Sequence, residues 1–158
     1  MKKTLRVILF MSLFSLLMGC ATNDKKEVNN SNSDEYTISK ESKYEISDDL
    51  VSMRMTGFLS ISLGTVTLTN HTDQSFIYGT SFLLEYEKKG IWYTLDNINP
   101  LIFTSIGYTL GPRESVEKKI NWGGYYGELK SGKYRVVDYV LPEDSIDPIY
   151  IVAEFIIE

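Results

Sequence analysis

The sequence predicts an all-β fold, an antiparallel β-sandwich, for the part of the chain that follows residue 45. From about residue 50 onward, short runs of alternating apolar and polar residues are separated by turn residues, and no stretch has a helical period over a useful length. Aromatic residues make up 13% of the chain and include eleven tyrosines, which suits a packed β-rich core. Residues 46–158 are enough for one domain and too few for two.

The first strands follow from the alternation of their side chains. In residues 65–69 valine and leucine alternate with threonine, and the polar residues 70–73 end this strand as a turn. The next run, within residues 78–87, has one apolar and one acidic face. Its apolar positions are Tyr78, Phe82, Leu84 and Tyr86, and its acidic positions are Glu85 and Glu87.

Lys88-Lys89-Gly90 predicts a tight hairpin, because glycine tolerates the positive φ that such turns require, and residues 91–95 return as the partner strand. Further strands are expected at residues 50–56, 102–110, 114–122, 133–141 and 150–157. Gly111-Pro112 and residues 141–144 are the breaks between them. Seven or eight short strands with regular turn signals predict an immunoglobulin-like sandwich, with a small closed barrel as the alternative.

The N-terminus has the anatomy of an export signal. Three basic side chains in residues 1–6 precede an apolar core at residues 7–17, which is too short to cross a bilayer. Leu17-Met18-Gly19-Cys20 resembles the lipobox of bacterial lipoproteins, although Met18 is larger than the residues common at that position. The resemblance implies a signal peptide over residues 1–19 and a diacylglyceryl group on the sulfur of Cys20. The alternative is an ordinary secretory signal followed by an incidental cysteine.

Residues 20–45 connect the lipid-modified cysteine to the sandwich. Beyond Cys20 the segment is rich in Asn, Ser, Lys, Asp and Glu and nearly free of aliphatic side chains. It cannot bury enough apolar surface to offset the entropy of ordering, so we expect a flexible polar tether, with a recognition tail as the alternative. Cys20 is the only cysteine in the chain, so the exported domain has no internal disulfide and depends on its core.

The charge of the chain bears on its partners. The net charge is −5, and removal of residues 1–19 takes away three basic and no acidic side chains and changes it to −8. An acidic surface repels phosphate backbones, so we expect no nucleic-acid partner. An anionic membrane also repels it weakly, so we expect the lipid to hold the protein at the extracytoplasmic face of the cell membrane.

A recognisable string lies toward the C-terminus. Residues 125–135 read YYGELKSGKYR and follow LGPRE at 110–114 and INW at 120–122. The pattern resembles a bacterial Ig-like domain family found on exported proteins and lipoproteins of Gram-positive bacteria, which has no agreed biochemical function. A weaker likeness runs to the Ig-like proteinase inhibitors of bacilli. Leu129, Gly132 and Tyr134 also have the spacing of a tyrosine corner, in which the tyrosine hydroxyl bonds back to the backbone upstream.

Few residues are candidates for catalysis or metal binding. His71 is the only histidine and lies two residues before Asp73 in a polar turn, and no G-x-S-x-G elbow occurs. Zinc requires three or four nitrogen or sulfur ligands, which this chain cannot supply. Glu143, Asp144 and Asp147 could offer oxygen ligands to calcium, but they lack the regular spacing of a calcium loop, and a solvated turn is the default. We expect no enzyme, metal or cofactor.

The candidate binding loop is Trp122-Gly123-Gly124-Tyr125-Tyr126-Gly127, which places three large rings among glycines at a sheet end. Aromatic rings suit sugar faces or the apolar pocket of a partner. The same residues are part of the structural motif of the family that this sequence resembles. We therefore favour a packing role for Trp122, Tyr125 and Tyr126 over a binding role.

These observations predict a membrane-anchored surface lipoprotein that presents a non-catalytic Ig-like binding or spacer module to an envelope protein or a cell-wall glycan. The alternative is an inhibitor or immunity-type lipoprotein that acts on an envelope protein through loops at the sandwich end. An inhibitor should present a rigid, protruding loop with an exposed apolar tip. A sugar binder should show coplanar exposed rings in a groove, and a spacer should show neither.

Overall fold

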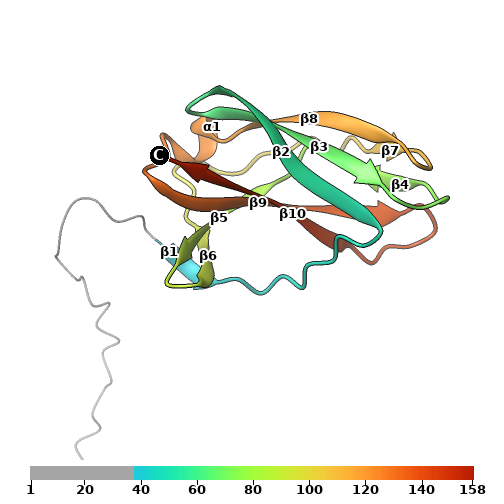
Figure 1. Ribbon diagram of the computed structural model, residues 1–158, viewed down its shortest axis with the longest axis horizontal. Coiled ribbons are helices and arrows are strands. Elements are labelled where there is room, and N and C mark those ends of the chain that lie inside the picture. The colour runs from blue at the N-terminus through green and yellow to red at the C-terminus, as the bar shows by residue number, and fades with distance from the viewer. Residues whose placement is uncertain (1–37) are drawn as a thin grey trace, which may run out of the picture. The chain divides into compact units, whose positions relative to one another are not determined.

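The computed structural model describes residues 38–158, which fold as two antiparallel β-sheets packed on one another (Figure 1). The strands of this region are β1 (Ile38–Glu41), β2 (Val51–Ser60), β3 (Leu63–Asn70), β4 (Phe76–Tyr78), β5 (Leu83–Lys88), β6 (Ile91–Leu95), β7 (Tyr108–Leu110), β8 (Ser115–Asn121), β9 (Gly132–Pro142) and β10 (Ile149–Ile157). A helix of one turn, α1 (Gly123–Tyr126), lies between β8 and β9. The predicted β-sandwich is confirmed, with ten strands within residues 38–158 where seven or eight were expected.

Strand β9 is the centre of the larger sheet. This sheet, sheet A, has the order β1-β6-β5-β9-β4-β7, and β10 pairs with the other edge of β9; sheet B has the order β2-β3-β8. Residues 134–137 of β9 pair with β5, and residues 140–142 pair with β4 on the same edge. Asp138 and Tyr139 therefore lie at a gap between β5 and β4.

The predicted β5–β6 hairpin is confirmed. Lys88 pairs with Ile91, so Lys89 and Gly90 form a two-residue turn, with φ angles of 55° and 82°. Two successive positive φ angles are what a type I′ turn requires, and this turn matches the right-handed twist of paired strands. Gly90 adopts this conformation without steric cost, which explains why the chain reverses here.

Two expected strands are shorter than predicted. The run at residues 78–87 is divided into β4 and β5, because the chain moves from one end of β9 to the other between them. Of the strand expected at residues 102–110, only β7 forms. The preceding segment is a loop held by Tyr125, whose hydroxyl donates to the carbonyl oxygen of Ile102 at 3.0 Å. The Ile102 side chain is exposed, so the apolar residues of this segment do not form a buried strand face.

The expected tether is wrong at its C-terminal end. The sequence predicts a flexible segment up to residue 45, but β1 pairs with β6 at the edge of sheet A. Beyond β1, the Ser42 N–H donates to the Trp92 carbonyl oxygen, and the Ser47 N–H donates to the Tyr150 carbonyl oxygen. The folded region therefore includes residues 38–45, which the sequence assigned to the tether.

Residues 38–47, here called the strap, run from β1 at one edge of sheet A to Ile46, which bridges to Tyr150 of β10. Between these edges the strap crosses the outer face of sheet A, which is the face turned away from sheet B. The Tyr44 ring packs on Tyr150 with 4.8 Å between ring centroids. Hydrogen bonds to strand edges order the strap, and its sequence carries little apolar surface of its own, so composition alone did not predict it. The export signal, Cys20 and the rest of the expected tether lie outside the described residues.

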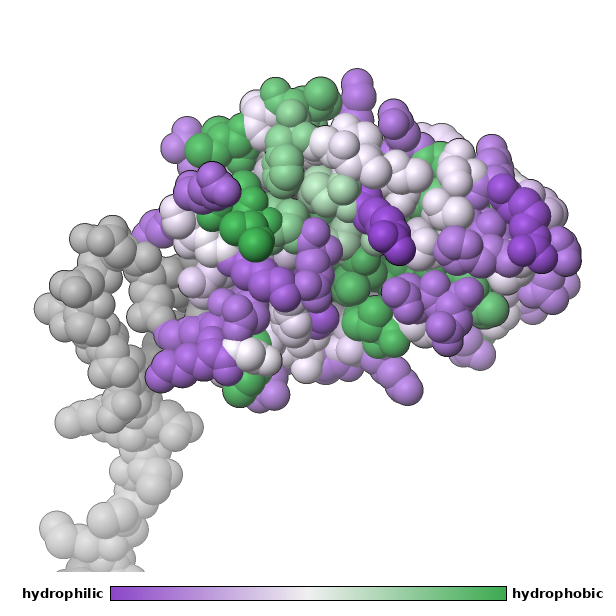
Figure 2. Space-filling model, in the orientation of Figure 1, coloured by the Kyte–Doolittle hydropathy of each residue, from purple (hydrophilic) through white to green (hydrophobic). Residues whose placement is uncertain are grey.

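The two ends of the sandwich differ in their surface. The β2–β3 turn, α1, the β5–β6 turn, β1 and the C-terminus lie at one end, called the hairpin end (Figure 1). The β3–β4, β7–β8 and β9–β10 connections lie at the other, called the acidic end. Figure 2 shows hydrophobic residues on the upper part of the hairpin end and in the middle of the face, and hydrophilic residues on the lower part of the hairpin end and over most of the acidic end.

Three stacked rings lie in the core between the sheets. Trp122 stacks on Phe155 with 5.3 Å between ring centroids, and Phe155 stacks on Tyr134 with 5.5 Å. All three side chains are buried. Because they come from the segments around β8, β9 and β10, the stack joins sheet B to sheet A.

The structure contains the hydrogen bond of a tyrosine corner. The Tyr134 hydroxyl donates to the carbonyl oxygen of Lys130 at 2.7 Å, and Leu129 is buried beside it. Gly132 passes so close to Tyr86 that a Cβ atom would lie 2.5 Å from the tyrosine ring. A larger residue at position 132 would force this ring to move, so the Leu-x-x-Gly-x-Tyr string is a requirement of packing.

Tyr134→Phe should lower the free energy of unfolding by about 1 kcal/mol, because it removes one hydrogen bond and leaves the stacked ring in place. Urea denaturation of the full chain measures this loss. Tyr108→Phe is the matched control, since Tyr108 is exposed at the edge of sheet A, and should leave the stability unchanged. Equal stabilities of the Tyr134 variant and the wild type would contradict the role of the corner.

Candidate functional site

The rings of the candidate binding loop are packing residues. Trp122 is fully buried and its indole N–H donates to the Ile61 carbonyl oxygen at 3.0 Å. Tyr126 is buried, its hydroxyl accepts the Leu84 N–H at 3.3 Å, and burial raises its pKa to about 12. Tyr125 is half-buried in a loop contact. The binding role considered for this loop is therefore corrected: the single turn of α1 directs these rings inward, where a ligand cannot reach Trp122 or Tyr126.

The acidic loop and the lone histidine do not form a reactive centre. Glu143, Asp144 and Asp147 are all exposed, and within residues 38–158 no group of three or more His, Cys, Asp or Glu side chains could hold a metal ion. The Nε2 atom of His71 lies 2.7 Å from the Ser52 hydroxyl on the exposed surface. Asp73, the nearest carboxylate in sequence, is paired with Arg113.

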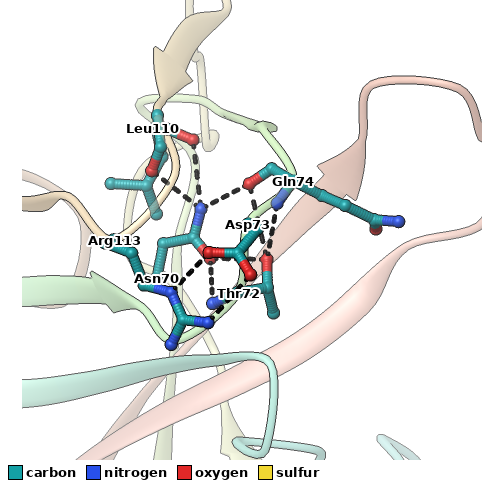
Figure 3. A network of polar contacts seen from close by, with 7 residues as sticks. Asn70, Thr72, Asp73, Gln74, Leu110 and Arg113 are labelled. Atoms are coloured by element: carbon teal, nitrogen blue, oxygen red, sulfur yellow. Dashed lines mark hydrogen bonds and ion pairs between the residues drawn. The ribbon is translucent and has the colours of Figure 1, made fainter.

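A polar network at the acidic end explains the turn that follows β3 (Figure 3). The buried Asn70 amide donates to the carbonyl oxygens of Gln74 at 2.7 Å and Gly111 at 2.8 Å, and its oxygen accepts the Thr72 N–H at 2.9 Å. These bonds fasten the end of β3 to the β7–β8 connection. The network satisfies its own donors and acceptors, so it is structural.

Asp73 and Arg113 form an exposed pair over this turn. Arg113 donates from Nε to one carboxylate oxygen of Asp73 at 2.8 Å and from Nη2 to the other at 3.1 Å, as Figure 3 shows. The hydrogen bond from Arg113 lowers the pKa of the Asp73 carboxyl. Because both carboxylate oxygens bind Arg113, Asp73 does not orient the His71 ring as a catalytic triad would require.

A pocket of about 220 Å³ opens on the outer face of sheet A, where β9 passes from β5 to β4. Its walls are mostly aromatic and aliphatic side chains; they include Tyr44, Phe82, Phe103, Val137, Tyr139 and Tyr150. These residues come from the strap, the β4–β5 and β6–β7 connections, β9 and β10. No local motif marks the site, because the fold alone brings these distant segments together.

The geometry of the rings defines what the pocket can accept. The planes of Tyr44 and Tyr150 meet at 49°, and those of Tyr139 and Tyr150 meet at 66°. Rings tilted in this way form walls and do not form the flat platform on which a sugar stacks. A second hollow, of about 500 Å³, adjoins the pocket through Phe103 and Tyr139 and extends toward Ile106. Together they make a groove, called the tyrosine groove.

A buried ion pair lies on the core side of β9 beneath the pocket. Lys118 of β8 donates from Nζ to Asp138 Oδ2 at 2.5 Å and to the Ser81 carbonyl oxygen at 2.7 Å, while the Tyr139 N–H donates to Asp138 Oδ1 at 2.8 Å. Burial raises the pKa of the Asp138 carboxyl, and the Lys118 charge acts in the opposite direction.

A second buried ion pair lies on the outer face, under the strap. The Arg135 guanidinium donates to Glu85 at 2.6 Å and to the Ser42 hydroxyl at 3.1 Å, and it lies 4.4 Å from the centroid of the Trp92 ring. The sequence predicted that Glu85 lies on an acidic face of its strand. Glu85 is buried instead, because Arg135 lies opposite it on β9 and neutralises its charge. Within residues 38–158 every buried side-chain nitrogen and oxygen has a hydrogen-bond partner.

Lys118→Met should lower the free energy of unfolding by about 3–5 kcal/mol at neutral pH, because it leaves the Asp138 charge buried without its partner. The loss should shrink as the pH falls toward about 4. Asp138 has a raised pKa in the folded state and this variant raises it further, so the folded protein gains stability where Asp138 is protonated. Urea denaturation across this pH range measures the effect.

Lys119→Met is the matched control, since Lys119 is the exposed neighbour of Lys118 on β8. This variant should change stability little at any pH. A loss for Lys118→Met that stays constant across the pH range would contradict the coupling to Asp138.

Two antiparallel sheets closed by a tyrosine corner, with a groove on one outer face, define an Ig-like β-sandwich module. A model of the bacterial Ig-like domain family matches residues 50–149, and the chain belongs to this family. Domains of this family are generally non-catalytic. A search of the curated proteins finds no match. Between residues 38 and 158, no helix has the length and apolar character needed to span a membrane.

Proposed function

We propose that this protein is a lipid-anchored, non-catalytic Ig-like module on the extracytoplasmic face of the cell membrane, where it binds an envelope protein. The tyrosine groove is the contact surface. It accepts an apolar side chain of the partner in the pocket between Tyr44, Tyr139 and Tyr150.

The shape and chemistry of the pocket carry this proposal. Its walls are aromatic, its buried polar atoms are already paired, and Tyr139 is 39% exposed at its mouth. Tyrosines at such a site bury much area for little loss of side-chain entropy. The tilt of the rings favours an inserted side chain over a stacked sugar, and a module that served only as a spacer would not need the groove.

The anchor is supported by the sequence. Leu17-Met18-Gly19-Cys20 follows a basic and then an apolar segment, as in lipoprotein signals. Cleavage at Cys20 leaves 17 residues between the acylated cysteine and β1. Two or three acyl chains bind a bilayer stably, at about 0.8 kcal/mol per buried CH₂.

The anchor predicts that cells expressing the full chain and fed a radioactive fatty acid label the protein. Cys20→Ala should abolish the label and move the protein from the membrane fraction to the soluble fraction, because no other thiol is present. Autoradiography of the purified chain measures both. Label that persists in the variant, or a wild-type chain without label, would contradict the anchor.

The groove predicts a position-specific cross-link. A photoreactive phenylalanine analogue at Ile106, 54% exposed at the rim of the groove, should form one discrete adduct with an envelope protein in intact cells. The same analogue at Lys119, exposed on sheet B, should form none.

Tyr139→Ala removes one wall of the pocket and should abolish the adduct from position 106. Tyr108→Ala, which removes another exposed ring of sheet A, should retain it. An adduct that survives Tyr139→Ala, or that forms equally from both positions, would overturn the role of the groove. Loss of binding after digestion of cell-wall glycan would assign the site to a sugar instead.

The alternative of an inhibitor or immunity-type lipoprotein requires contact through loops at the sandwich end. The β2–β3 hairpin, with an apolar tip at the hairpin end, is the feature that favours it. An adduct formed with an envelope protein from Ile61 in this tip, and not from Ile106, would select the inhibitor.

A further inference from the structure

The β2–β3 turn presents three apolar side chains to solvent. Phe58, Leu59 and Ile61 are 50%, 58% and 53% exposed. Phe58 and Leu59 lie at the end of β2, and Ile61 lies in the turn. Single exposed apolar residues are common on soluble domains, whereas three within four residues of one hairpin make an apolar patch of the kind that contacts a partner or a membrane. The proposed groove on sheet A leaves this patch unexplained.

The turn is held rigidly, so the exposure of its side chains is built into the fold. The N–H groups of Trp122 and Gly123 both donate to the Ser62 carbonyl oxygen at 3.1 Å, and the Trp122 indole N–H donates to Ile61. One side of the Phe58 ring lies against Phe155, with 5.7 Å between centroids. The buried aromatic stack therefore packs against the β2–β3 hairpin and holds its turn in one orientation.

The charges of the two ends favour one orientation of the module beside an anionic bilayer. The acidic end, formed by residues 46–50, 70–75, 111–114 and 142–149, has seven acidic side chains and one basic one. The hairpin end, formed by residues 38–41, 57–63, 87–91, 121–132 and 156–158, has four acidic and four basic side chains. Anionic headgroups repel the first end and not the second.

The chain that leads from Cys20 enters the domain at the same end. β1 lies at the hairpin end, and 17 residues separate it from Cys20 (Figure 1). A chain of this length spans at most about 60 Å, so β1 of an anchored module stays within that distance of the bilayer surface. Attachment at this distance makes a second, weak contact with the same bilayer effectively intramolecular.

We propose that the β2–β3 hairpin docks on the lipid bilayer, with Phe58, Leu59 and Ile61 inserted among the headgroups and the acidic end turned outward. The occupant of the apolar patch is thus the membrane to which the chain is anchored. This inference rests on the lipid anchor of the proposed function. Docking leaves the tyrosine groove, on the side of the sandwich, open to a partner.

The experiment uses the full acylated chain in vesicles of phosphatidylcholine and phosphatidylglycerol. Because Cys20 is the only native cysteine and its sulfur carries lipid, a new cysteine is the single free thiol. Ile61→Cys places an environment-sensitive fluorophore at the tip. Ile146→Cys places the same fluorophore at a side chain 92% exposed on the acidic end. It is the matched control for binding of the apolar fluorophore itself to lipid.

Docking predicts that the probe at position 61 shifts its emission to shorter wavelength and is quenched by lipids with a nitroxide near the headgroup. The probe at position 146 should show neither change. Leu59→Asp in the Ile61→Cys chain should remove the quenching, because it places a charge in the inserted turn.

Several results would overturn the docking. They are equal quenching at both positions, no quenching at position 61, or a response at position 61 to envelope proteins and not to lipid. Flotation of the same vesicles separates the two proposals. A chain that floats without quenching at position 61 contradicts the docking alone, whereas a chain that does not float contradicts the anchor and the docking together.

Discussion

The backbone pairing of β9 is the constraint on which the rest of the structure depends. β10 occupies one edge of β9, and β5 and then β4 share the other. Because neither β5 nor β4 covers residues 138 and 139, a gap remains in the sheet, and the pocket lies there. Side chains alternate along β9, so Tyr134 faces the core while Arg135 and Tyr139 face outward. A slip of one residue would displace the stack, both ion pairs and the pocket at once.

The two buried ion pairs specify this register. Asp138 is paired with Lys118 across the sandwich, and Arg135 is paired with Glu85 along the sheet. Burial of a charge is costly unless its partner is in place, so any other register would leave four charges unpaired in the interior. The strap completes the second pair, because the Ser42 hydroxyl accepts a further hydrogen bond from Arg135. The strap is therefore part of the folded domain, and it also supplies Tyr44 to the pocket.

The sequence predicted those features that depend on neighbouring residues. Alternating side chains predicted most strands, Lys89-Gly90 predicted the hairpin, and the motif that ends in Tyr134 predicted the tyrosine corner. Prediction failed where order comes from distant partners. The strap has little apolar surface and is ordered by the edges of β6 and β10. Ile102 belongs to an apolar run that looked like a strand, but its segment is a loop held by the hydroxyl of Tyr125.

The sequence by itself determined an all-β domain, because side-chain period and turn chemistry are properties of adjacent residues. Only the tertiary structure decided which aromatic rings are available to a ligand. Trp122 and Tyr126 have the composition of a binding loop, and one turn of helix buries them. Tyr44, Tyr139 and Tyr150 carry no motif, and the pairing of β9 with its neighbours brings them together around a pocket. Exposure depends on what packs above a side chain, and that partner is distant in the sequence.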